Sequence, residues 1–125
     1  MSSTFFWLAA LVGIASLAIH AVGGARVYSK AILAAAELPP PAKALSLVTW
    51  HCASIMFLSY ALAMAIAALR PDAVELAFLA IFMCTATVLV FAVFALRGHT
   101  ALVRLPGAYL CASIALLGVA GILTA

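Results

Sequence analysis

Residues 74–96 read VELAFLAIFMCTATVLVFAVFAL, and this stretch decides the fold class. Glu75 is its single charged residue, and Thr85 and Thr87 are its only hydroxyl groups. As a helix rising 1.5 Å per residue, it would be about 35 Å long, enough to cross a hydrocarbon core of about 30 Å. Backbone polar groups in lipid must bond one another, and the alternation of a barrel strand is absent. The stretch is therefore predicted to be a membrane-spanning helix.

The same pattern recurs at about residues 5–23, 44–69 and 105–125. The chain has 125 residues, of which 70% are hydrophobic and 7% are charged, and its mean hydropathy is +1.36. A water-soluble domain needs far more polar surface than this. The sequence predicts an all-α fold, an integral membrane antiparallel four-helix bundle. Residues 1–125 would form a single transmembrane domain.

The connection between the first two spans, residues 24–43, is the longest. Its middle, residues 27–36, favours a short helix lying at the membrane interface. Pro39-Pro40-Pro41 then ends that helix, because proline disfavours helical backbone in the residue before it.

Charge predicts the orientation. The first and third loops lie on one side and carry five basic residues, Arg26, Lys30, Lys43, Arg97 and Arg104. The other side has only Arg70, with Asp72 and Glu75 nearby. The positive-inside rule places the first and third loops in the cytoplasm and both termini in the periplasm of a bacterial inner membrane. No Lys/Arg cluster with interleaved aromatic residues occurs, so the lipid bilayer and not nucleic acid is the expected partner.

His20 and His51 lie inside the first and second apolar segments. An ionisable side chain within a membrane span is costly, so it marks a candidate site. Because these spans are antiparallel, both histidines fall in the cytoplasmic half, about 5 and 10 Å deep at helical rise. Three interpretations fit the pair: a shared haem or transition metal, a pocket for a quinone or another lipophilic ligand, or a polar contact that fixes helix register.

Small residues predict how the helices pack. Ala9, Gly13, Ser16, His20 and Gly23 share one face of the first span, so His20 is expected in a helix–helix contact. The fourth span has a similar face. Its members are Ala108, Cys111, Ala115, Gly118 and Gly121, while Leu110, Ile114 and Leu117 are expected to face lipid.

The second span is expected to present one face containing the second histidine. That face consists of His51, Ser54, Leu58, Ala61 and Ala65. Trp50, Ser16 and Ser54 are therefore candidate cofactor-binding residues beside the two histidines, which are themselves the candidate metal ligands. His99 lies in a loop and is expected to be solvated.

Catalytic patterns are lacking in the sequence. No Ser-His-acid arrangement, paired carboxylates within a span, Gly-rich phosphate loop or HExxH motif occurs, so an enzyme is not predicted. The three cysteines, Cys52, Cys84 and Cys111, have no CxxC spacing and are expected to be small buried hydrophobic residues.

Three short motifs resemble those of a group of small uncharacterised bacterial four-span integral membrane proteins. They are Ile19–Gly24 (IHAVGG), Glu37–Pro40 (ELPP) and Thr49–His51 (TWH). The group shares a histidine before paired glycines, a Leu-Pro-Pro step and a Trp-His pair, and the resemblance covers most of the chain. It implies architecture and bacterial origin but no activity. Here Ala25-Arg26-Val27 follows the glycines where relatives have a proline or acidic residue, which argues against a metal site needing an acid there.

The sequence thus predicts a small inner-membrane accessory or interaction protein, with a cofactor or lipophilic ligand held between His20 and His51. It would act in a larger membrane complex or as a homo-oligomer. The alternative is a small transporter or channel subunit. With so few polar groups inside the spans, transport would need an oligomer.

Overall fold

The computed structural model describes residues 2–124, and over that range it contains helices and no strand, as the composition predicted. In chain order the elements are α1 (Ser2–Ala18), η1 (Ile19–Ser29), α2 (Lys30–Ala34), α3 (Pro40–Leu69), η2 (Pro71–Ala73), α4 (Val74–Leu96), η3 (Thr100–Arg104) and α5 (Pro106–Leu123). The segments long and apolar enough to cross a membrane are Ser3–Ala34, Pro40–Leu69, Pro71–Leu96 and Pro106–Leu123.

The first helix is longer than the sequence indicated. Segments α1, η1 and α2 form one continuous helix of 32 residues, Ser3–Ala34. The predicted end near Gly23 and the separate helix over residues 27–36 are therefore wrong. The paired glycines lower helix propensity by about 1 kcal/mol each. Contacts of both η1 and α2 with α3 support the helix past them until the backbone becomes extended at Ala35.

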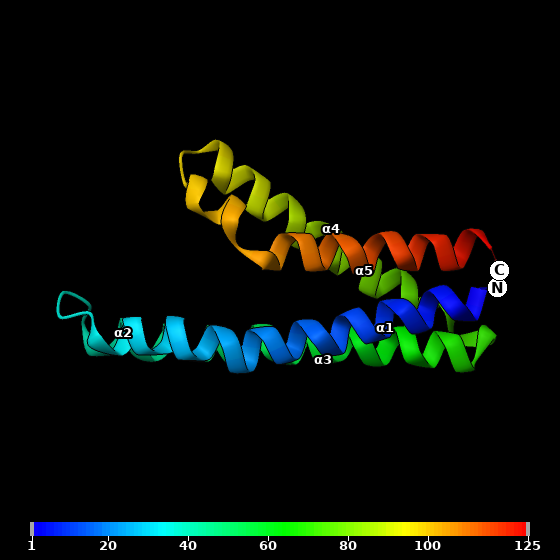
Figure 1. Ribbon diagram of the computed structural model, residues 1–125, viewed down its shortest axis with the longest axis horizontal. Coiled ribbons are helices and arrows are strands. Elements are labelled where there is room, and N and C mark those ends of the chain that lie inside the picture. The colour runs from blue at the N-terminus through cyan, green and yellow to red at the C-terminus, as the bar shows by residue number, and fades with distance from the viewer. Residues whose placement is uncertain (1, 125) are drawn as a thin grey trace.

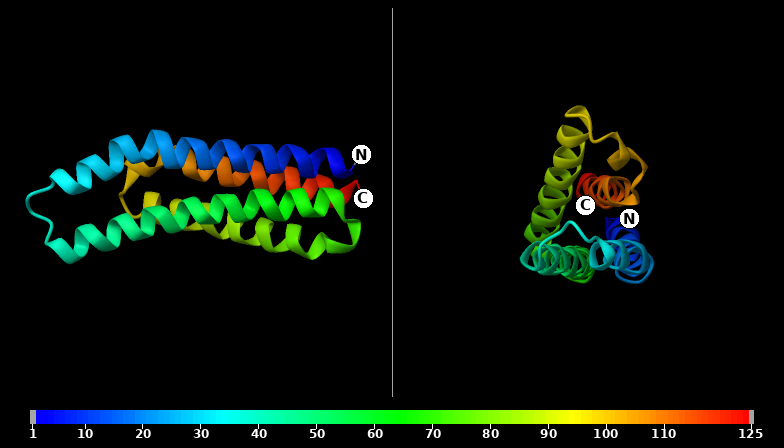
Figure 2. Two further views of the ribbon diagram at one scale, coloured as in Figure 1. Left: turned by 90° about the horizontal axis from the view of Figure 1, so that it is seen from below. Right: turned by 90° about the vertical axis from the view of Figure 1, so that its left-hand side faces the viewer.

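Each of the four long segments packs against two others. Helix α1 contacts α3 and α5, and α4 contacts α5 and α3. The chain termini and the η2 turn lie at one end of the molecule, while the α2–α3 and α4–α5 connections lie at the other (Figures 1 and 2). At this second end, α4 swings away from the α1–α3 pair (Figure 1).

The buried core occupies only the half near the termini. On the first helix it extends from Phe6 to Ser16, and on α5 it begins at Cys111. Neither η1 nor η3 contains a buried residue. Cys84 and Cys111 are fully buried, as predicted, but Cys52 is exposed, contrary to the prediction. The molecule is therefore tightly packed at one end and loosely packed at the other.

Small residues allow the helices to approach closely in the packed half. A Cβ atom at Gly13 would lie 2.9 Å from the Ala61 Cβ, and one at Gly118 would lie 2.7 Å from the Met64 Cε. Most of the predicted small-residue faces of α1 and α5 are thus confirmed as packing faces. Ile114, which was predicted to face lipid, is instead fully buried, because α5 packs against both α1 and α4.

The buried face of α3 differs from the predicted one. It consists of Ser54, Phe57, Tyr60, Ala61, Met64 and Ala67. Ser54 and Ala61 belong to the predicted face, but His51 and Leu58 are exposed. Successive helical residues point about 100° apart. A modest rotation of α3 about its own axis therefore turns His51 away from the neighbouring helices and brings other residues of α3 into the contact.

Replacing Gly13 with alanine is expected to destabilise the protein. The added methyl group meets both the Ala61 side chain and its backbone, at 2.9 and 3.1 Å, and the helices must separate. Overpacking of this kind costs about 1–3 kcal/mol. The midpoint of thermal unfolding in detergent should fall, whereas Gly23→Ala, with no atom within 4 Å of its new Cβ, should leave it nearly unchanged. Equal midpoints for the two variants would contradict this packing account.

Candidate functional site

His20, in η1, forms a hydrogen bond with a serine of the neighbouring helix α3. Its Nδ1 atom lies 3.0 Å from the Ser54 Oγ. Ser54 is buried, and its hydroxyl also donates to the Trp50 carbonyl oxygen four residues earlier, at 3.4 Å. The predicted helix–helix contact of His20 is therefore confirmed, with Ser54 as its partner.

Trp50 lies between two other rings. The imidazole of His20 is stacked on it at a centroid distance of 3.7 Å and an interplanar angle of 15°. The Tyr28 ring is also stacked, at 4.5 Å and 17°. Two rings cannot share one indole face at those distances without overlapping, so His20 and Tyr28 cover opposite faces. Stacked pairs contribute about 0.5–1.5 kcal/mol each beyond their buried area.

Gly24 makes room for this indole. A Cβ atom at Gly24 would overlap the Cζ2 of Trp50 and lie 2.7 Å from its Cη2. At neighbouring Gly23 a Cβ would meet nothing within 4 Å. The paired glycines therefore have different roles, and only the second is required by the tryptophan.

The helix is wound differently along this contact. Residues Ile19–Ser29 form a π-helix, in which hydrogen bonds join residues five apart. The π-helix usually occurs as a single widened turn and is frequent at functional sites. Here it extends over 11 residues and carries both His20 and Tyr28. Residues eight apart rise about 12 Å in an α-helix. The wider turn shortens that rise, which suits two rings on either side of one indole.

The indole is held by stacking and packing. Its Nε1 atom is buried and has no hydrogen-bond partner among residues 2–124. A buried donor without an acceptor costs about 1–3 kcal/mol, which the two stacked rings offset.

A cavity of about 560 Å³ adjoins the ring stack, where the helices diverge. One wall comes from η1 and α2, and the others come from α3, α4 and the beginning of α5. Its lining is almost entirely apolar and includes the rings of His20, Tyr28, Trp50, Phe57 and Phe91. This volume falls within the range of about 300–1,000 Å³ typical of small-molecule sites.

The predicted site residues are only partly brought together. His20 and Trp50 line the cavity, and Ser54 supports them from behind by bonding His20. Ser16 is fully buried elsewhere, where its hydroxyl donates to the Val12 carbonyl at 2.6 Å. His51 is exposed and does not line the cavity. Within the described part of the chain, no group of three or more His, Cys, Asp or Glu side chains is placed to hold a metal ion.

Sequence reasoning missed the contributions of Gly24, Tyr28, Phe57 and Phe91. The sequence pattern places Gly23, and not Gly24, on the packing face of the first span, and it assigns Tyr28 to a separate helix. One sequence pattern points to this contact: a glycine pair and a tryptophan that lie at a similar depth on two neighbouring antiparallel helices. Small residues leave space between helices in which a large ring can insert.

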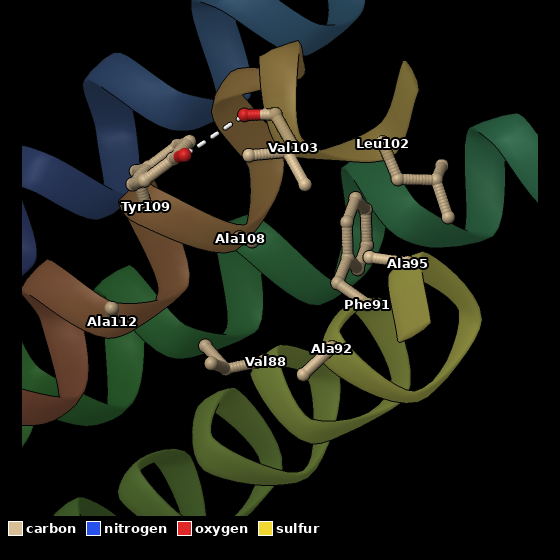
Figure 3. A pocket seen from close by; sticks show the side chains of 9 residues that line it. All are labelled: Val88, Phe91, Ala92, Ala95, Leu102, Val103, Ala108, Tyr109 and Ala112. Carbon is tan, nitrogen blue, oxygen red and sulfur yellow. Dashed lines mark hydrogen bonds between the residues drawn. The ribbon is translucent and has the colours of Figure 1, made fainter. Parts of the chain in front are cut away.

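A second hollow, of about 290 Å³, lies between α4, η3 and α5 (Figure 3). The Tyr109 hydroxyl donates to the Val103 carbonyl at 2.8 Å beside it and ties η3 to the start of α5 (Figure 3). Phe91 lines both hollows. The smaller one contains no histidine, cysteine or charged residue. The larger cavity is therefore the candidate ligand site.

No protein family, curated protein or solved structure matches the chain.

Gly24→Ala is expected to expel Trp50 from between its two neighbours, because the new methyl group occupies the space of the indole. The chain has two tryptophans, so Trp7→Phe makes Trp50 the only one. In that background the near-ultraviolet circular dichroism of Trp50 should decrease strongly, since the ring loses its fixed surroundings. Gly23→Ala is the matched control and should retain the signal. A signal that survives Gly24→Ala would show that the glycine is not needed.

Proposed function

We propose that this chain is a multi-pass protein of a bacterial inner membrane that holds a lipophilic ligand in the cavity beside His20 and Trp50. The observation that carries the proposal is a largely apolar cavity of about 560 Å³ with the imidazole of His20 in its stacked aromatic wall. Apolar walls with few placed polar groups are typical of small-molecule sites. The protein would serve as an accessory subunit and not as an enzyme.

The size of the cavity supports an occupant. With a volume of about 560 Å³ and an opening to its surroundings, the cavity can admit and hold a molecule of ordinary ligand size. Water gains little in a cavity with so few polar partners. A lipophilic molecule is therefore the favoured occupant.

The location of the cavity suits a ligand that reaches it through the bilayer. As proposed, the four long segments form an antiparallel bundle in the membrane. The first helix has 32 residues and would be about 48 Å long if α-helical throughout; with its shorter π-helical segment it still exceeds the hydrocarbon core of about 30 Å. Its exposed Arg26 and Lys30 would lie among the lipid head groups of the inner leaflet. The cavity then lies at the boundary between head groups and hydrocarbon, where amphipathic molecules concentrate.

The orientation is testable by labelling a cysteine at Ser29. With Cys52 replaced by alanine, the remaining native cysteines are buried. A membrane-impermeant maleimide added to intact cells should not label Ser29→Cys, because the positive-inside rule puts this segment in the cytoplasm. Thr4→Cys, near the opposite end, should be labelled. Labelling of Ser29→Cys from outside would reverse the proposed topology.

Ligand binding is testable with 1-bromo-4-decylbenzene, an apolar ring with a tail, whose bromine quenches tryptophan fluorescence on contact. In the Trp7→Phe protein in lipid nanodiscs, we expect saturable quenching of Trp50, because this ring lines the cavity. Gly23→Leu should weaken the quenching about tenfold or more, since Gly23 lines the cavity and has open space for a side chain.

Ala21→Leu is the matched control, because Ala21 is exposed on the same helix and does not line the cavity. Its quenching curve should match that of the parent protein. Quenching that rises linearly without saturation, or that is equal in the two leucine variants, would indicate ordinary bilayer contact and reject the ligand site.

A further inference from the structure

Several serine and threonine hydroxyl groups within the helices of this chain make the same hydrogen bond. They donate their proton to the backbone carbonyl four residues earlier, as this type of side chain commonly does in helices. The examples are Ser16 to Val12 at 2.6 Å, Ser59 to Ile55 at 3.0 Å, Thr87 to Met83 at 2.9 Å and Ser113 to Tyr109 at 2.9 Å. Ser54 stands in the same relation to the Trp50 carbonyl, at 3.4 Å. Because a carbonyl oxygen can only accept, the single proton of Ser54 lies in this bond.

This assignment fixes the proton on His20. Because the Ser54 hydroxyl has only one proton, its oxygen accepts the 3.0 Å bond from His20, and Nδ1 carries the hydrogen. A neutral imidazole has one N–H group, so the other nitrogen, Nε2, has a free lone pair. No group of residues 2–124 donates to Nε2, and His20 lines the cavity. His20 can therefore offer a ligand in the cavity only a hydrogen-bond acceptor, the Nε2 atom.

The cavity walls favour a flat molecule. Of its 14 lining residues, five carry aromatic or imidazole rings, and they come from η1, α3 and α4. Such rings bind a planar ring in offset or edge contact. If one water-sized group occupies about 30 Å³, the cavity has room for about nineteen of them. A six-membered ring with a tail of about ten carbons fits this space.

We infer that the ligand is a phenolic lipid: a planar ring whose hydroxyl group donates to His20 Nε2 and whose apolar tail fills the rest of the cavity. This inference rests on the ligand site proposed above and narrows it to one chemical class. Phenols and the hydroquinone forms of membrane quinones share the required group. A ring with only ether or carbonyl oxygens lacks the proton that Nε2 needs. Ser54 acts as a positioning residue, since it selects the proton position on His20 without contacting the ligand.

The test uses three competitors that differ at one group. In nanodiscs containing the Trp7→Phe protein, 4-decylphenol, 4-decylanisole and 4-decylbenzaldehyde each displace 1-bromo-4-decylbenzene, and recovery of Trp50 fluorescence gives their relative affinities. We expect the phenol to bind about tenfold more tightly than the anisole, and the aldehyde to resemble the anisole. A hydrogen bond worth about 1.4 kcal/mol corresponds to that factor. Equal affinities, or tighter binding of the aldehyde than of the phenol, would overturn the inference.

Two variants assign the preference to the proposed groups. His20→Phe keeps a planar ring beside Trp50 but has no acceptor, so the ratio of phenol to anisole affinity should fall to about one. Ser54→Ala frees the imidazole to carry its proton on either nitrogen, and the ratio should fall several-fold. Ser59→Ala removes an exposed hydroxyl of the same helix and should keep the full ratio. A full ratio in His20→Phe would place the selective group elsewhere.

The two proposals fail in different ways. If the brominated reporter shows no saturable quenching, the ligand site itself is wrong. If the reporter binds and is displaced equally by all three competitors, the site stands and only the assignment of a hydroxyl-bearing ligand is wrong.

Discussion

The site depends on the insertion of one indole ring between two side chains of the neighbouring helix. Trp50 fits there because Gly24 has no side chain and because the π-helical segment brings His20 and Tyr28 to opposite faces of the ring. The stack also leaves the indole N–H group without a partner among residues 2–124, so its geometry is maintained at a cost. Strained or costly local structure of this kind clusters at functional sites.

The two halves of the molecule on either side of this insertion are packed differently. Near the termini, glycine and alanine contacts draw the four long segments into a closed core, with Met64 and Ile114 fully buried. Toward the other end α4 diverges from the α1–α3 pair, and no side chain of η1 or η3 is buried (Figure 1). In the proposed membrane setting, the open half would face the lipid and offer a route into the cavity from the bilayer. The proposed ligand site lies where the two halves meet.

Much of the fold could be predicted because hydrophobicity and small-residue spacing are local signals. The four apolar segments and the packing faces containing Gly13 and Gly118 follow from them. The end of the first helix could not be found in this way. A glycine pair lowers the intrinsic stability of a helix, but here the contacts of η1 and α2 with α3 outweigh that loss.

The candidate site was only half predictable for a related reason. Trp50 and His51 are adjacent, so they point about 100° apart and only one of them can face His20. Which one does so depends on the rotation of α3, and this is set by distant contacts such as Gly13 with Ala61. Neither hydropathy nor spacing carries that information. The π-helical winding of residues 19–29 likewise follows from neither signal.

The most direct test of the ligand site is to map where a lipophilic phenol contacts the chain. A decylphenol bearing a diazirine in its tail is bound to the protein in nanodiscs and photolysed, and the modified residues are located by mass spectrometry. The account predicts labels concentrated within residues 19–31 and 105–110, which contain most of the residues that line the cavity, and their loss when unlabelled 4-decylphenol is in excess. Labels spread evenly over exposed hydrophobic residues remote from it, such as Phe78 and Phe82, and insensitive to competition, would contradict it.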